Sequence, residues 1–547
     1  MYTFASNSNS QSCLDRIYTR LDLAKSLYDW DTATTSIPSD HKLILVCFTP
    51  PKTPYVGHGR WTWPLRLLSN NDLTKQIAAL GIELQTALDD PTAPTGSNAQ
   101  QKWNQFKIDI TDLAKRTARV QLAKLDNHIN TLKKDIACAT QDLLTDQQEA
   151  TRSNIITLEN ELKHIQRKRY KNMHARTQAQ WHDRGEKISK YWTAVNTPRR
   201  PRNIIYSLRD PNTNTLTKKS SKMAEIARNY HDELQQTNHP VHDDPLCEAA
   251  RMSVLSEIPP AQTLNDQHSP LPSLITEDQI TQALCVSKNG TTTGLNGIPY
   301  ELWKSLNTLH VTNSKLQKPT FDIIKCLRLI YNEIQTEGTD PTSQFAVGWM
   351  CPIYKKKDQT KIENYRPIAL LNTDYKLMTK VLATQLALHA CNLLDPDQME
   401  FVPTRSIFNP IRLAETMCAY ADFMEENSAI IALDQEKAYD KIDHEYLIDM
   451  LKTFCLPDLF VNTIKSIYLH TSTSVAINGV LSKPYQVTRG VQQGDPLSCL
   501  LFNLAIEPLA AAIRNSPELT GFTIPRNNYE CSSKPICRRH HSLLIGV

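Results

Sequence analysis

The chain has 547 residues, of which 22% are charged and 40% hydrophobic, and its formal net charge is +4. A chain of this length divides into two to four folded units rather than one core. The composition is ordinary for a globular protein. The net charge is too small to indicate by itself that the protein binds a polyanion.

The thirteen cysteines are scattered and odd in number, and they form no CxxC pair. This usage is typical of free thiols in a reducing compartment. The polar N-terminus has no apolar signal-peptide core, and the most apolar helical stretch, Leu500–Ile513, is shorter than a membrane span. We therefore expect an intracellular protein, in the nucleus or the cytoplasm, that is not secreted and has no transmembrane segment.

Residues 1–68 contain short strand-like runs between polar turns, such as Leu43–Phe48. Residues 69–202 are predicted to be largely helical. One apolar seam follows spacings of three and four and consists of Leu122, Leu125, Ile129, Leu132 and Ile136. A second seam, in a shifted phase, consists of Ile155, Leu158, Leu162 and Ile165. The polar interval between them fits a stutter in one long helix or a turn between two helices, and we favour an antiparallel pair.

A basic stretch with aromatic residues follows, from His164 to Arg176, and continues to Pro198–Arg202. Such a patch suits the phosphate backbone of RNA, although a solvated helix surface has the same composition. Residues 203–274 are rich in Asn, Thr, Asp and Pro and predict a connector with one helix.

Residues 275–525 mix both patterns and predict an α+β domain. The apolar run Ser428–Asp434 predicts a strand that ends in a carboxylate, and Asp443 is a predicted N-cap for the next helix. A carboxylate at a strand tip suits a Mg²⁺ site, but such residues are more commonly caps or turns. Asn478 and Gly479 predict a type I′ hairpin turn.

Glycines and cations mark two further segments of this region. Gly490 and Gly494 allow a close backbone approach before a helix that Asp495 can cap. Lys355 and Arg366 belong to two extended pieces, and a guanidinium there can grip a triphosphate at two points. A solvated surface is the alternative for each of these charges.

The order of these segments resembles one protein family. RPIALLNTDYKLMTKVLA, DQMEFVPTRSI, ALDQEKAYDKIDH and GVQQGDPLSCLLFNLAIEPL resemble the ordered fingers and palm motifs of the reverse transcriptases of LINE-like (non-LTR) retrotransposons. The segment Thr291–Lys304 resembles the family's opening motif, and the whole resemblance covers about residues 275–522. It implies the fingers and an incomplete palm of a right-hand polymerase, without a thumb.

The resemblance also implies site residues. Asp434 corresponds to the first metal-binding, catalytic carboxylate of the palm, and Tyr439 to the ring that a ribose 2′-OH would strike. The family uses two Mg²⁺ ions, with template RNA, a DNA primer and dNTPs as partners. The residues implied for the nucleotide are Lys355, Arg366, Tyr439, Gln493 and Gly494, and the residue implied for template or primer is Arg405. Glu400 stands where the family has glycine, which leaves the geometry of that turn open.

One element of the family has no counterpart. The family completes its metal site with an aromatic-Ala-Asp-Asp hairpin, and no such sequence follows the Gln-Gly-Asp-Pro motif. The codons for Ile536–Ser542, shifted by one nucleotide, permit Phe or Tyr followed by Ala-Asp-Asp-Thr-Thr. We hypothesise a frameshift that makes residues 526–547 a tail in a foreign frame. The Cys and His residues of this tail lack the paired spacing of structural zinc.

The N-terminal residues resemble a second family. SQSCLDRIYTRLD, SDHKLILVCFTP and GRWTWPLRLL resemble the last strands of an apurinic-type endonuclease, an α/β sandwich that precedes the polymerase in LINE-like elements. Asp40 and His41 match its final catalytic segment, where an Asp–His pair orients groups around the scissile phosphate. The early metal-binding Glu of that fold is absent, so we expect an endonuclease remnant without nicking activity.

These patterns predict an RNA-directed DNA polymerase domain of a non-LTR retrotransposon, truncated at both ends and inactive in this form because the Ala-Asp-Asp hairpin is missing. Two alternatives stay open, a non-catalytic RNA-binding relic and a decayed copy whose product has no role. The predicted order is endonuclease remnant, helical linker, connector, fingers with partial palm, and frameshifted tail, over residues 1–68, 69–202, 203–274, 275–525 and 526–547.

Overall fold

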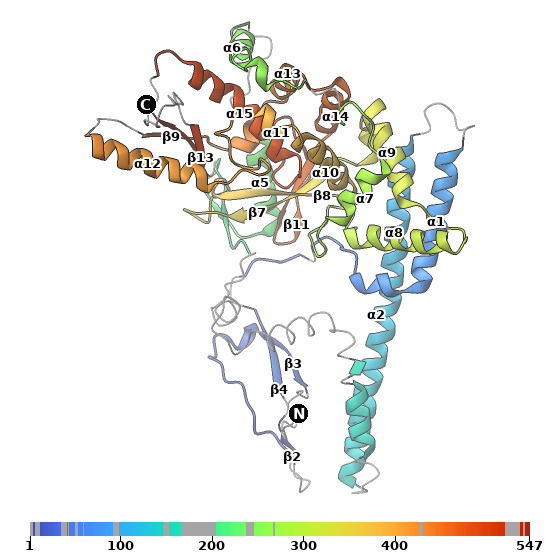
Figure 1. The fold of residues 1–547 in the computed structure, drawn as a ribbon. Coiled ribbons are helices and arrows are strands. Elements are labelled where there is room, and N and C mark those ends of the chain that lie inside the picture. The colour runs from blue at the N-terminus through green and yellow to red at the C-terminus, as the bar shows by residue number, and fades with distance from the viewer. Residues whose placement is uncertain are drawn as a thin grey trace. The chain divides into compact units, whose positions relative to one another are not determined.

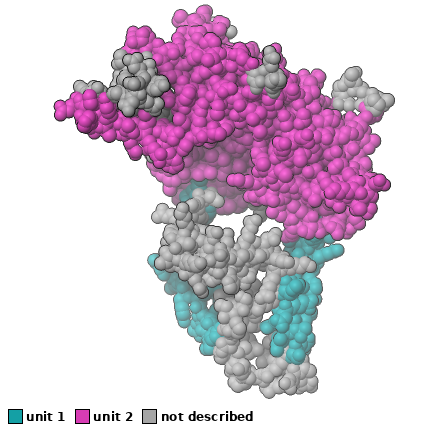
Figure 2. Space-filling model, in the orientation of Figure 1, with its two compact units in different colours: residues 1–55, 115–206 teal, residues 56–114, 207–547 magenta. Residues whose placement is uncertain are grey.

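The computed structural model of this chain describes a defined set of segments, which are residues 4–5, 11–33, 41, 43–49, 53–57, 59–90, 98–145, 153–162, 164–165, 204–236, 245–265, 269–425, 430–519, 536–539 and 542–546. The chain divides into two compact units (Figures 1 and 2). Unit 1 comprises residues 1–55 and 115–206, and unit 2 comprises residues 56–114 and 207–547.

Unit 1 contains short antiparallel strand pairs. β3 (Leu27–Ala33) pairs with β4 (Leu43–Phe48), which confirms the strand predicted over the second of these ranges. β1 (Phe4–Ala5) pairs in the same sense with β2 (Gln11–Ser12).

Unit 1 also contains a pair of helices. α2 (Ala99–Thr145) begins in unit 2 and continues into unit 1, and residues 153–162 are helical as well. Ile165 packs with Ile129 and Leu132 of α2 in one apolar cluster. A single straight helix would separate Ile165 from Leu132 by about 50 Å, so the chain must turn back between them. This packing confirms the antiparallel pair over the stuttered helix.

Unit 2 is built on a mixed five-stranded sheet with the order β11-β10-β7-β8, and β12 also pairs with β10. β7 and β8 are antiparallel, whereas β10 and β7 are parallel. The turn between β10 and β11 has φ of 50° at Asn478 and 76° at Gly479, which confirms the predicted type I′ geometry. The strands are β7 (Val347–Tyr354), β8 (Tyr365–Leu371), β10 (Ser472–Ile477), β11 (Val480–Leu481) and β12 (Tyr485–Gln486).

Helices surround this sheet, and α5 contacts its β10, β11 and β12 strands (Figure 1). The helices of unit 2, besides the first turns of α2, are α1 (Asn71–Asp89), α5 (Ser220–Gln236), α6 (Pro245–Leu255), α7 (Glu277–Cys285), α8 (Tyr300–Lys315), α9 (Ile323–Glu337), α10 (Thr373–Ala387), α11 (Ala390–Leu393), α12 (Phe408–Met424), α13 (His444–Thr453), α14 (Asp458–Leu469) and α15 (Ser498–Asn515). None of the helices in the described ranges is both long and apolar enough to cross a bilayer.

The start of α13 and the number of helices in residues 203–274 bear on the sequence predictions. The Asp443 side chain accepts a hydrogen bond of 2.9 Å from the Tyr446 backbone N–H, which confirms the predicted N-cap of α13. Residues 203–274 hold two helices, α5 and α6, where one was predicted. The second was missed because α6 is short and buries only Leu255, so it leaves little apolar periodicity.

The first turns of α2 are anchored in the core of unit 2. Trp103 Nε1 and Lys107 Nζ both donate to Asp374 Oδ2 on α10, at 2.9 and 2.8 Å. All three side chains are buried, and the Trp103 ring also lies 5.4 Å from that of Trp303 on α8. A buried carboxylate is tolerated when it is paired and hydrogen-bonded in this way. The contacts explain why residues 98–114 fold as part of unit 2.

Candidate functional site

The strand that precedes the candidate catalytic residue forms as predicted. β9 (Ile430–Asp434) ends at Asp434, whose side chain is exposed. β9 pairs antiparallel with β14 (Ser542–Gly546), with Asp434 opposite Ser542. β14 in turn pairs with β13 (Ile536–Arg539) in a three-stranded sheet (Figure 1). Asp434 therefore lies level with the end of this sheet where β13 leads into β14.

The residues after β9 fold into a short 3₁₀ helix, η6 (Ala438–Lys441). The Tyr439 ring stacks on Phe502 of α15, with centroids 4.5 Å apart and planes 7° apart, and only 6% of Tyr439 is exposed. Burial raises the pKa of the neighbouring Asp440 to about 6, although Lys437 opposes the shift. Tyr439 thus packs as a core residue in this conformation.

The loop that contains Gln493 and Gly494 is held between β8 and η6. The Ala369 N–H donates to the Gln493 carbonyl at 2.7 Å, and the Val491 N–H donates to the Tyr439 carbonyl at 2.8 Å. Gly494 has φ of +127°, and a Cβ added there would lie 2.3 Å from the Ala369 carbonyl oxygen. The close approach predicted for this glycine is therefore made to the protein's own strand β8.

A small cavity of about 40 Å³ opens beside this loop. Its walls include Gln493, Asp440, Pro367 and Ala369, but not Asp434, Arg366 or Tyr439. That volume admits a water molecule but not a nucleotide. The structure thus brings Gln493 and Gly494 to the C-terminal half of β8, and it does not gather all the predicted residues around one cavity.

The two predicted fingers cations lie where the β7–β8 hairpin turns. Lys355 directly follows β7, and Arg366 on β8 is paired with Ile353 on β7. Both cations are exposed. Pro367, the next residue of β8, lines the cavity, whereas Arg366 does not, because successive side chains of a strand point to opposite faces of the sheet.

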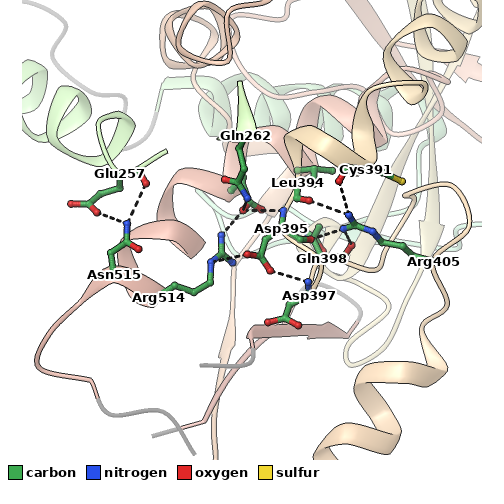
Figure 3. A network of polar contacts seen from close by, with 11 residues as sticks. Glu257, Gln262, Cys391, Leu394, Asp395, Asp397, Gln398, Arg405, Arg514 and Asn515 are labelled. Atoms are coloured by element: carbon green, nitrogen blue, oxygen red, sulfur yellow. Dashed lines mark hydrogen bonds and ion pairs between the residues drawn. The ribbon is translucent and has the colours of Figure 1, made fainter. Parts of the chain in front are cut away.

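Arg405 belongs to a polar network (Figure 3). Its guanidinium donates to the carbonyls of Leu394, Gln398 and Cys391 at 3.0, 2.7 and 3.1 Å, and to that of Asp395. The bonds to Cys391 and Leu394 satisfy backbone carbonyls at the C-terminal end of α11. Both terminal nitrogens of Arg405 are therefore engaged by backbone rather than presented to solvent.

In the turn that contains Glu400, residues other than Glu400 adopt the left-handed backbone conformation. Phe401 and Thr404 have φ of 56° and 67°, and the Glu400 carbonyl accepts a hydrogen bond of 2.5 Å from Asn503 Nδ2. The non-glycine residue at position 400 is thus accommodated without a positive φ of its own.

Among the N-terminal candidates, Asp40 lies outside the described residues. His41 is described, and its Nδ1 lies 2.8 Å from Asp15 Oδ2. An Asp–His pair therefore exists, but the carboxylate comes from the SQSCLDRIYTRLD segment rather than from the neighbouring residue. The sequence indicated that segment by its resemblance but did not indicate Asp15. Asp15 could have been identified only from knowledge that the two segments lie together.

Asp495 does not cap α15 as predicted, because the helix begins at Ser498 with Leu497 as its N-cap residue and without a side-chain cap bond. Asp495 Oδ1 accepts from the Leu497 N–H at 3.3 Å just before α15, and Tyr375 donates to its Oδ2 at 3.4 Å. The side chain is buried, and burial raises its pKa to about 6. Among the described residues no group of three or more His, Cys, Asp or Glu side chains could hold a metal ion. The described donors therefore do not fit a pair of Mg²⁺ ions.

Comparison with known proteins gives a consistent result. The family "Reverse transcriptase (RNA-dependent DNA polymerase)" matches residues 354–529. The transposon TX1 uncharacterized 149 kDa protein of Xenopus laevis is 25% identical over 521 residues, 94% of this chain and 37% of that protein. A Pol polyprotein of retrotransposable element R2 from Nasonia vitripennis is 28% identical over 37% of this chain and 19% of its own length. A probable RNA-directed DNA polymerase from transposon BS of Drosophila melanogaster is 28% identical, over 37% of this chain and 22% of its own length.

Residues 354–529 thus form a reverse transcriptase domain, and they contain β8, β9 and the Gln493 loop just described. The relatives are transposon and retrotransposon proteins, and the chain spans little more than a third of the length of the TX1 protein. This region is similar to the reverse transcriptases of LINE-like, non-LTR retrotransposons.

Proposed function

We propose that this domain descends from an RNA-directed DNA polymerase that extends a DNA primer along template RNA from dNTPs. The observation that carries the proposal is Asp434, an exposed carboxylate at the end of β9 inside the matched region. In a complete site Asp434 would hold one of two Mg²⁺ ions, which would supply charge stabilisation and activation of the primer 3′-OH.

The nucleotide would approach from the β7–β8 hairpin. Arg366 and Lys355 are exposed cations on that hairpin and suit a triphosphate. Gln493 and Gly494 would form the floor beside them. The packing of Tyr439 on Phe502 means that a steric role for this ring requires it to rotate away from the core. Arg405 would act by shaping the turn after α11 through its carbonyl contacts rather than by touching template or primer.

We further propose that the chain does not polymerise DNA in this form, because one carboxylate cannot hold two ions. The pairing of β13 with β14, and of β14 with β9, supports the frameshift hypothesis. Residues 536–539, on β13, are the four whose shifted codons permit the aromatic-Ala-Asp-Asp sequence. Two carboxylates on β13 would be separated from β9 only by β14. They would lie at the same end of the sheet as Asp434.

Primer extension tests this proposal. The chain is assayed with a primed RNA template, dNTPs and Mg²⁺, beside a variant with Ile536→Tyr, Cys537→Ala, Arg538→Asp and Arg539→Asp. We expect no product from the natural chain, product from the fourfold variant, and none when Asp434→Ala is added. Extension by the natural chain that survives Asp434→Ala would overturn the catalytic assignment. RNA binding without extension by either protein would favour the non-catalytic alternative.

For the N-terminal residues we propose an endonuclease remnant. The Asp15–His41 pair supports it, because an Asp–His pair of 2.8 Å orients an imidazole as phosphodiester cleavage requires. A nicking assay on supercoiled DNA should show no product. Nicking that is lost in His41→Ala would contradict the expected inactivity.

A further inference from the structure

A cluster of cations lies outside the proposed polymerase site, where the segment before η2 (Leu65–Ser69) meets α10. Arg60 lies over the Trp349 ring of β7, with its guanidinium carbon 5.0 Å from the ring centroid. On α10, Lys376 Nζ lies 3.2 Å from the Thr292 carbonyl and 5.7 Å from the Tyr300 ring centroid. The segment is fixed there, since the Trp63 N–H donates to the Gly297 carbonyl at 3.0 Å.

The cations continue along α10. Lys380 lies one helical turn beyond Lys376, about 6 Å along the axis, and its Nζ contacts Ser287 Oγ at 3.1 Å. Lys304 of α8 reaches the Ser287 carbonyl at 2.6 Å. These lysines contact neutral oxygens and an aromatic ring rather than carboxylates.

The charges of this cluster repel one another. Burial and the proximity of Arg60 and Lys380 lower the pKa of Lys376, while Asp495 opposes the shift. Burial, with Lys304 and Lys288, lowers the pKa of Lys380. One oxygen of the nearby Glu301 carboxylate, Oε1, accepts from the Gly290 N–H at 2.6 Å, and the other, Oε2, is buried without a hydrogen-bond partner among the described residues.

Buried donors without acceptors occur at the same place. Arg60 Nε and Trp349 Nε1, which belong to the stacked pair, are buried and have no hydrogen-bond partner among the described residues. The same is true of Thr293 Oγ1 and Trp63 Nε1, whose side chains are 5% and 4% exposed. A buried donor without a partner is destabilising, and a bound acceptor would offset that cost. Donors of this kind suit an anion with several acceptor oxygens.

We propose that Arg60, Lys376 and Lys380 bind the phosphodiester backbone of a nucleic-acid strand, with Arg60 and Lys376 on one phosphate. A guanidinium and an ammonium together suit a phosphate, and a row of cations along α10 suits a polyanion better than a single ion. The inference rests on the proposed function for its nucleic acid, but none of these residues belongs to the proposed metal or nucleotide site. Arg60 also lies outside the segment matched as reverse transcriptase.

Binding of a labelled single-stranded oligouridylate to the full chain tests the site, by fluorescence anisotropy over a salt series. The Arg60→Gln/Lys376→Gln variant should bind about tenfold more weakly at low salt, and its slope of log affinity against log salt should be shallower by about 1. The matched control, Lys315→Gln/Lys318→Gln, removes the same charge from exposed positions at the end of α8 and should bind as the parent does. Equal affinity and slope in all three proteins would overturn the proposal.

Two further arms address folding and the source of the phosphate. Arg60→Lys keeps the charge and should retain most of the salt slope, while thermal melts report whether each variant is folded. Inorganic triphosphate should displace the RNA only weakly at equal phosphate concentration. Full displacement would assign the site to a free nucleotide and overturn the strand assignment. Primer extension is scored separately, so a chain that binds RNA through Arg60 but never extends a primer contradicts only the polymerase proposal.

Discussion

Asp434 is exposed at the end of β9, whereas near the Gln493 loop Asp440 is half-buried and Asp495 is buried. Burial raises the pKa of both Asp440 and Asp495 to about 6. In the folded state these two carboxyls therefore hold their protons more tightly than in the unfolded chain. The stability that they contribute is present at low pH and is lost as the pH rises through about 6.

Asp495→Asn tests this assignment, because it keeps the oxygen that accepts from Leu497 and removes the charge. We expect the stability of the variant relative to the natural chain to improve by on the order of 2 kcal/mol as the pH rises from about 4 to about 7. Chemical denaturation at several pH values measures it. A difference between the two proteins that does not change with pH would show that the buried carboxyl does not titrate as described.

The buried pair between Lys107 and Asp374 allows a second prediction. Lys107→Met leaves the Asp374 carboxylate buried with Trp103 as its remaining side-chain donor, and should cost about 3–5 kcal/mol of unfolding free energy. Lys222→Met breaks an exposed pair with Glu225 and should cost less than about 1 kcal/mol. Similar losses in the two variants would contradict the anchoring of α2 in unit 2.

Thr404 provides a third prediction, at the turn before α12. It is exposed and has φ of 67°, a conformation that is strained for a β-branched residue. Thr404→Gly should raise the unfolding free energy by about 1 kcal/mol, since the released strain exceeds the added chain entropy. Thr404→Ala keeps a Cβ and serves as the control. A glycine variant no more stable than the alanine variant would argue against strain at this position.

At the scale of single elements, local patterns predicted most of what depends on neighbouring residues. The strand that ends at Asp434, the cap at Asp443 and the turn at Asn478 and Gly479 all formed as expected. Each depends on interactions within a few residues, which the sequence displays directly.

Contacts between distant segments were not predictable in the same way. Lys107 and Asp374 are far apart in the sequence, and nothing local indicates that they pair. The parallel pairing of β10 with β7 and the Asp15–His41 contact belong to the same class. Asp440 lines the cavity wall, and its position there depends on contacts between segments that the sequence does not display.

The helical pair of unit 1 permits a prediction at this scale. Leu132→Ala removes a side chain from the cluster with Ile129 and Ile165 and should destabilise the pair by about 2–4 kcal/mol. Val120→Ala, at an exposed position of α2, should change little. Hydrogen exchange of the α2 amides after residue 120 would show the difference. Equal protection in the two variants would mean that the second helix does not stabilise the first.

At the scale of the whole molecule, the reverse transcriptase domain includes less than half of unit 2, and the first turns of α2 supply part of that unit's core. The TX1 protein of Xenopus laevis aligns with 94% of the chain, so its similarity extends well beyond the matched domain. We propose that Asp434 is the remaining member of a carboxylate site whose other members would occupy β13.

Manganese binding followed by electron paramagnetic resonance tests that claim most directly, because Mn²⁺ replaces Mg²⁺ at oxygen ligands and its signal changes when it is bound. The natural chain should bind little Mn²⁺. The variant with aspartates at positions 538 and 539 should gain binding, and adding Asp434→Ala should remove that gain. A variant that binds no more Mn²⁺ than the natural chain, or whose gain survives Asp434→Ala, would contradict the account.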